Sequence, residues 1–141
     1  MKELHAAVVD VVDEMNRPRR DDRLINEAGI PLDRALFPLL VRIDRFGPIG
    51  VVDLADRVGR DHTTVSRQMA KLEELGLIER RVSSTDKRVR EATVSAHGLT
   101  MIKALNSARE RIADKVLASW TDEELDGLRA LLRRYADDIM R

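Results

Sequence analysis

The feature that most constrains the fold is a pair of short helical patterns separated by a very short turn. Residues 51–58 repeat apolar side chains at i, i+3, i+4 and i+7, which is one face of a helix. Gly59 is a usual helix stop, and a second helical pattern, RDHTTVSRQMAKLEELG, begins at residue 60. Two helices joined by a turn of about three residues predict a helix-turn-helix.

The second helix separates its side chains by face. At about 100° per residue, one narrow arc collects the residues expected to be buried: Val65, Met69, Leu72 and Gly76. The opposite side carries hydroxyl side chains and Arg67 near the amino end, where we expect Asp61 to cap the helix. Short donors and an arginine in the first two turns are typical of a recognition helix that reads base edges. A solvated face that happens to hold Thr and Ser is the plainer alternative.

A basic hairpin is predicted directly after this helix. Residues 77–82 and 88–95 are strand candidates, and SSTDKR forms the tip between them. Asp86 stands two residues before Arg88 and could orient its guanidinium through a bidentate pair. An arginine at a loop tip can enter a narrow minor groove. Charge that protects an exposed strand edge is the alternative reading.

Amphipathic helices are expected on both sides of this module, over residues 3–16, 20–28, 31–46 and 95–119, and from about residue 121 to the terminus. Pro38 lies inside the third and predicts a kink. Ser95 should cap the fourth, with Ile102, Leu105, Ile112 and Val116 buried, and Thr121 to Glu124 reads as a capping box. The first and last helices have apolar stripes that the module does not need, so we expect them to pair with each other and with a second copy of the chain. The plainer alternative is that they wrap the chain's own core.

Composition excludes several classes of protein. The 141 residues are 43% hydrophobic and include no cysteine, so a real core is possible, while disulfide and thiolate chemistry is not. Net charge is zero, but residues 57–90 hold 9 basic and 5 acidic side chains, a local excess that can attract nucleic acid. We find no signal peptide, no membrane span, no phosphate loop and no nucleophile or zinc-protease motif. We therefore expect a cytoplasmic protein without cofactor that is not an enzyme.

The stretch LADRVGRDHTTVSRQMAKLEELGLIERRVSSTDKRVREATVSAHG resembles the core of the multiple antibiotic resistance regulator (MarR) family. The matching features are a Leu-Ala helix, a Thr/Ser-rich helix ending in Leu-Glu-x-x-Gly-Leu-Ile, and an Asp-x-Arg wing. The resemblance implies a mainly α (α+β) fold, a winged helix-turn-helix with N- and C-terminal dimerisation helices. It implies a division into residues 1–30 (N-terminal dimerisation part), 31–98 (DNA-binding lobe) and 99–141 (C-terminal dimerisation helices).

The resemblance further implies a homodimeric transcription regulator, usually a repressor, that binds pseudo-palindromic double-stranded DNA and is released by a small aromatic or anionic effector. Pro18 and Pro38 depart from the family pattern, so no effector-binding residue is assigned. Together with the helix and wing reasoning above, it gives the following candidate DNA-binding residues: Arg60, His62, Thr63, Thr64, Ser66, Arg67, Gln68, Lys71, Arg81, Asp86, Lys87, Arg88 and Arg90.

Two rivals keep the same fold. A metal-responsive regulator could use His5 and His97 with carboxylates on zinc, although no paired ligand spacing is present. A protein-interaction adaptor would have lost DNA contact, and its expected mark is replacement of Arg67 and Arg88, which are both present. The operator, the regulated genes, the effector and the sign of regulation do not follow from the sequence.

Overall fold

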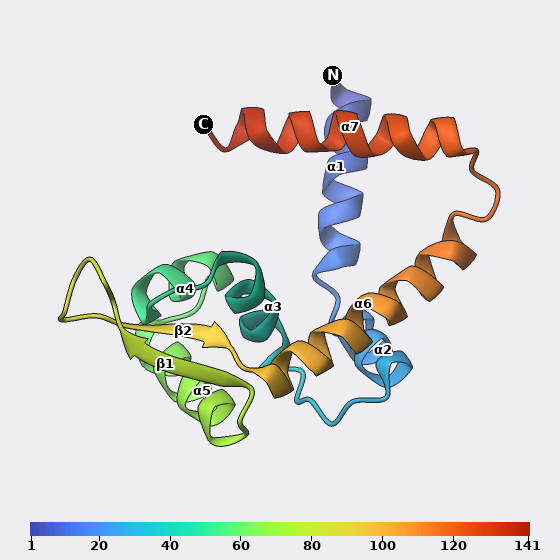
Figure 1. The fold of residues 1–141 in the computed structure, drawn as a ribbon. Helices are drawn as coiled ribbons and strands as arrows, with labels where there is room; N and C mark the ends of the chain where they lie inside the picture. Colours follow the sequence, from blue (N-terminus) through green and yellow to red (C-terminus); the bar gives the residue numbers. More distant parts are fainter. The chain divides into compact units, whose positions relative to one another are not determined.

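The computed structural model describes all 141 residues (Figure 1) and divides into two compact units, Met1–Ala108 and Arg109–Arg141. The chain is mainly helical with one small sheet, and none of its helices is long and apolar enough to cross a membrane. The elements in chain order are α1 (Lys2–Met15), α2 (Pro18–Ala28), α3 (Phe37–Phe46), α4 (Val51–Val58), α5 (His62–Glu74), β1 (Ile78–Val82), β2 (Arg90–Val94), α6 (Ala96–Val116) and α7 (Asp122–Ile139). The predicted division at residues 30 and 98 stays a prediction.

The helix-turn-helix forms as the sequence predicts. Helix α4 ends at Gly59, whose φ of 67° is the left-handed conformation that glycine adopts without strain, and α5 begins two residues after Arg60. Val65, Met69 and Leu72 are fully buried and face α3 and α4. Gly76 is exposed, contrary to its expected place in the buried arc. The helix has already ended there, because Gly76 adopts a φ of 74° that turns the chain into β1.

The hairpin packs beside α5 (Figure 1) and gives the lobe its wing. Strands β1 and β2 pair antiparallel from Ile78 opposite Val94 to Val82 opposite Arg90. Ile49 adds a short third segment to this sheet, since its amide and carbonyl exchange hydrogen bonds of 3.1 and 2.8 Å with Ala92. The hairpin is thereby held on its inner side by backbone bonds, and its tip projects from the lobe.

Ser95 connects the wing to α6. Its hydroxyl donates to the Gly76 carbonyl at 2.6 Å and accepts from the Gly98 amide at 3.0 Å, which is the predicted capping role. Gly98 lies so close to the Leu77 carbonyl that a Cβ would collide with it. The start of α6 is therefore fixed against the end of the recognition helix and the first strand.

The predicted kink at Pro38 is wrong. Helix α3 begins at Phe37, so Pro38 occupies the first turn, where its missing N–H has no intrahelical acceptor to lose. The segment from Pro31 to Leu36 is turn and loop. Pro18 likewise lies in the first turn of its helix, at the first position of α2. Both prolines start helices, and neither bends one.

The predicted burial of the distal half of α6 is also wrong. Met101, Ile102 and Leu105 are buried against the lobe, but Ile112 is only half-buried and Val116 is 66% exposed. The buried seam ends at Ala108, which is also where the first compact unit ends.

Candidate nucleic-acid interface

The outer face of α5 carries an exposed set of polar and basic side chains. His62, Thr63, Ser66, Arg67 and Lys71 are all exposed on this face. Lys71 lies 3.8 Å from Glu74 one turn later, a contact weak enough for a phosphate to replace. The face therefore offers hydroxyl, imidazole, guanidinium and ammonium donors along about two and a half turns.

The amino end of this helix is held by a carboxylate. Asp61 accepts a hydrogen bond from the Thr64 amide at 2.8 Å and another from the Thr64 hydroxyl at 2.6 Å. These two bonds, the hydroxyl first, hold the pKa of the Asp61 carboxyl below its ordinary value. Thr64 is half-buried and uses its hydroxyl proton inside the protein, so it can offer DNA only its remaining lone pairs.

The wing tip presents one arginine in a defined orientation. Asp86 accepts from the Arg88 amide at 3.0 Å, from Nε at 3.1 Å and from Nη2 at 3.2 Å, which is the bidentate pair that the sequence predicts. The side-chain bond from Arg88 is the larger of the two effects that hold the pKa of Asp86 below its ordinary value. The Arg88 side chain remains 90% exposed. The tip therefore carries a positioned guanidinium with a free outer edge.

The other wing candidates differ in their contacts. Lys87 and Arg81 are exposed, and Arg81 stands opposite Glu91 in the strand register. Arg90 Nη2 lies 4.0 Å from Glu73 Oε2 on the recognition helix. Arg90 thus connects the wing to α5, in addition to any contact that it makes outside the protein.

Two of the candidate residues bind each other. Arg60 Nη1 donates to Gln68 Oε1 at 2.9 Å and to the Ala35 carbonyl at 2.7 Å. Both side chains are half-buried. The sequence shows no sign of this contact, because Arg60 and Ala35 are 25 residues apart.

Comparison with known proteins agrees with this geometry. The model of the MarR family matches residues 32–89, which extend from the segment before α3 to the wing tip. The crystal structure of MarR is 30% identical, with a TM-score of 0.70 over 88% of this chain and 86% of that one. The chain belongs to the MarR family. It is also 35% identical over 103 residues to the uncharacterized HTH-type transcriptional regulator YxaD of Bacillus subtilis, covering 73% of this chain and 72% of that protein.

A MarR family protein from Bacillus stearothermophilus supports the fold. Its TM-score is 0.80 over 99% of this chain and 95% of that one, at 19% identity. The MarR-family chain described here is thus a transcriptional regulator with a DNA-binding winged helix-turn-helix.

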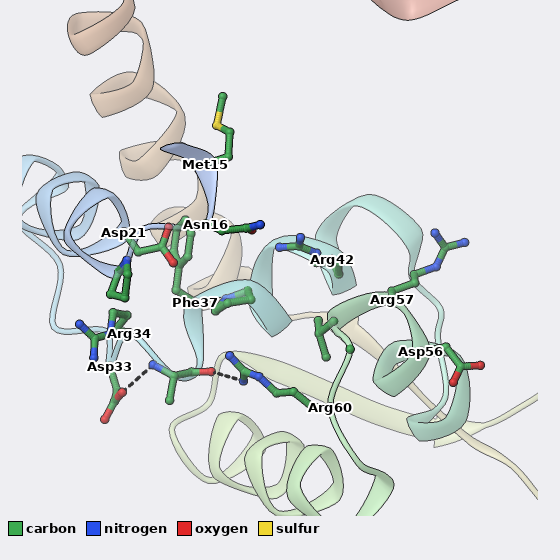
Figure 2. Close-up of a pocket in the computed structure, with 15 residues that line it drawn as sticks. Met15, Asn16, Asp21, Asp33, Arg34, Phe37, Arg42, Asp56, Arg57 and Arg60 are labelled. Carbon is green, nitrogen blue, oxygen red and sulfur yellow. Dashed lines mark hydrogen bonds between the residues drawn. The ribbon is translucent and has the colours of Figure 1, made fainter. Parts of the chain in front are cut away.

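The MarR-family lobe also has an open cleft of about 760 Å³ beside α3, which sequence reasoning missed (Figure 2). Its lining includes Phe37 and four guanidinium groups, those of Arg34, Arg42, Arg57 and Arg60. The lining of the cleft comes from five separate segments between Met15 and Arg60, so no local sequence motif could have predicted it.

The charges in this cleft are mixed. Burial raises the pKa of the Asp21 carboxyl, and Arg42 opposes that effect. Arg34 is paired with Asp22 at 2.9 Å, while Arg57 stacks on the Phe46 ring with its guanidinium carbon 3.6 Å from the ring centre. Arg42 and Arg60 are therefore the guanidiniums that point into the cleft without a carboxylate hydrogen-bonded to them.

The residues proposed for zinc do not form a site. No group of three or more His, Asp or Glu side chains lies close enough together to hold a metal ion. His5 is on α1, and His97 is exposed in the first turn of α6.

Proposed function

We propose that this regulator is a homodimeric repressor that binds a pseudo-palindromic operator and is released by a small anionic effector. The observation that carries the DNA part is the exposed amino half of α5 beside a positioned arginine at the wing tip. In this arrangement a helix enters the major groove while the wing reaches the flanking minor groove.

The exposed residues divide by chemistry. Thr63, Ser66 and Arg67 lie on the outer face of the first turns and are assigned to base edges. Arg88 is assigned to the minor groove, where Asp86 orients it. The remaining exposed candidates are assigned to the phosphate backbone, directly or at the margin of the contact: His62, Lys71, Arg81, Lys87 and Arg90.

The operator and the base contacts can be tested together. Selection of genomic DNA fragments bound by the purified protein should give a pseudo-palindromic motif. The substitution Arg67→Ala should then cost about 1–3 kcal/mol of binding free energy on that operator and relax preference at one base position. Equal losses on the operator and on unrelated DNA would make Arg67 a phosphate contact instead.

The dimer is supported by two uncovered apolar stripes. Helix α1 exposes Leu4, Val11, Val12 and Met15, each about half accessible, and no residue of α1 is buried. Helix α7 exposes Leu128, Leu132, Tyr135 and Ile139 and likewise has no buried residue. Amphipathic helices of this kind need an apolar partner, and a second copy of the chain supplies one. Light scattering after size-exclusion chromatography should give twice the chain mass of 16.0 kDa, and a monomer at micromolar concentration would contradict the dimer.

The effector is supported by the cleft. A small carboxylate could bind Arg42 while an attached aromatic ring lies near Phe37 and Pro38. Benzoate should therefore raise the midpoint of thermal unfolding and weaken operator binding, whereas uncharged benzamide of the same shape should do neither. Arg42→Ala should abolish the benzoate response, and a response that survives this substitution would place the effector elsewhere.

A further inference from the structure

Arg60 is the side chain that connects the recognition helix to the wall of the cleft. It lies in the turn between α4 and α5, and its backbone amide donates to the Ala55 carbonyl at 3.1 Å. Its Nη1 donates outward to the Ala35 carbonyl, in the segment before α3 (Figure 2). The same nitrogen donates to Gln68, in the second turn of α5. One guanidinium group therefore joins three separate parts of the lobe.

The segment that receives Arg60 is itself fixed. The Asp33 side chain accepts a hydrogen bond from the Ala35 amide at 2.7 Å, and the Asp33 carbonyl accepts one from the Leu36 amide at 3.0 Å, so the peptide groups on both sides of Ala35 are held. Two side chains of the same segment, Leu32 and Leu36, are buried in the core of the lobe. The Arg60 guanidinium is therefore bound to a fixed segment on one side, and through Gln68 it restrains the position of α5 on the other.

The contact also changes the role of Gln68. Its amide oxygen accepts from Arg60 and its side chain is half-buried, unlike the exposed Thr63 and Arg67. A glutamine that reads adenine must offer both its oxygen and its nitrogen to one base edge. With one lone pair of the oxygen bound to Arg60 and the side chain half-buried, Gln68 is poorly placed to present that bidentate pattern to a base.

We propose that Arg60 is a positioning residue, which holds α5 at a fixed angle through Gln68 and contacts no DNA itself. Arg60 and Gln68 then act as one unit. Operator binding depends on the bond between them, because the bond determines where the exposed first turns of α5 lie relative to the groove. The proposal concerns the DNA-binding activity of the family and does not depend on the effector or on the base assignments.

A double-mutant cycle tests whether the two residues act as one unit. Operator affinity is measured by fluorescence anisotropy for Arg60→Ala, Gln68→Ala and the double variant. We expect each single substitution to weaken binding about tenfold and the double variant to bind no more weakly than the worse single variant. Losses that multiply, to about a hundredfold, would mean two independent DNA contacts and would overturn the proposal.

The salt dependence of binding separates positioning from phosphate contact. Removing one phosphate contact lowers the slope of log affinity against log salt by about 0.9. Arg60→Ala should leave this slope unchanged, whereas Lys87→Ala, an exposed wing residue assigned to phosphate, serves as the control that lowers it. A lower slope for Arg60→Ala would place its guanidinium on the DNA backbone.

Gln68→Ala decides the question if Arg60→Ala fails to fold, which circular dichroism will show. This variant keeps Arg60 and its bond to Ala35. It should weaken binding by the same factor on the operator and on operators with single base changes. If preference is relaxed at one base position only, Gln68 reads that base, and the proposal is wrong.

Discussion

The winged-helix lobe and the helices at the two ends of the chain use the same apolar residues with very different results. In the lobe, α3, α4, α5 and the hairpin surround five side chains that are fully buried, those of Leu39, Leu40, Leu54, Met69 and Leu72. In α1 and α7 the same kinds of side chain repeat at the same helical spacing, and none is buried. The comparison teaches that amphipathic spacing predicts a helix in both regions but guarantees a core only where partner elements are available within the chain.

The largest effect on the free energy of unfolding should come from a substitution in the core of the winged-helix lobe. Leu72→Ala should lower the free energy of unfolding by about 2–5 kcal/mol, since it leaves a cavity among fully packed neighbours. Urea unfolding at a fixed protein concentration measures this loss. The matched substitution is Leu131→Ala on α7, where the side chain is 67% exposed within one chain, so the loss should be clearly smaller than at Leu72. Equal losses at both positions would remove the distinction between the two regions.

A substitution in the apolar stripe of α7 should instead weaken dimerisation. Leu132→Asp places a charge in the α7 stripe and should raise the dissociation constant of the dimer at least about a hundredfold, because the charge would lose its water at the interface. Analytical ultracentrifugation measures the constant, and circular dichroism should still show a folded lobe. Ala130→Asp lies on the opposite face of α7 and is the control that leaves the dimer intact. A dimer indifferent to both changes would place the interface away from α7.

Within the lobe, the wing should affect binding without affecting stability. Arg88→Ala should weaken operator binding about tenfold at physiological salt, because it removes the guanidinium assigned to the minor groove. Its thermal midpoint should equal that of the parent, since an exposed ion pair contributes little to stability. Arg134→Ala, an exposed arginine on α7 paired with Asp138, is the control and should bind DNA normally. Unchanged affinity for Arg88→Ala would refute the role of the wing.

The smallest effect concerns the cap of the recognition helix. The pKa of Asp61 is lower in the folded protein than its ordinary value, so its contribution to stability is present above that value and is lost as the pH falls through the folded pKa. Asp61→Asn can still accept from the helix amides but does not titrate in this range. Thermal unfolding between pH 7 and pH 3 should therefore fall less steeply for Asp61→Asn than for the parent. Parallel curves would show that this carboxylate contributes nothing to acid sensitivity.

Local patterns predicted most of the DNA-binding lobe. Gly59 and Asp61 mark the turn and cap, and the arc of Val65, Met69 and Leu72 gives the buried face, because these signals act within a few residues. The pair of Asp86 and Arg88 was predictable for the same reason, since the two residues are only two positions apart in the sequence. The false kink at Pro38 shows the limit of periodicity, which cannot tell where in a pattern the first helical turn begins.

The contacts that cross the lobe were not predictable in this way. Arg60 looked like another basic residue near the recognition helix, and Gln68 like another polar residue on its surface. Their bond, and the bond of Arg60 to Ala35, exist because the turn and the segment before α3 meet in space. The arginine-lined cleft arises from the same convergence of distant segments.

Spacing, capping and charge are local properties, so the amino-acid sequence predicts the helices, the turn, the hairpin and the basic excess around the recognition helix. Which polar side chains remain free to meet DNA, and which are held by other parts of the protein, became visible only in the folded chain. A hydrogen-bonding group is available to a ligand only when the fold has not already satisfied it, and that depends on residues far away in sequence.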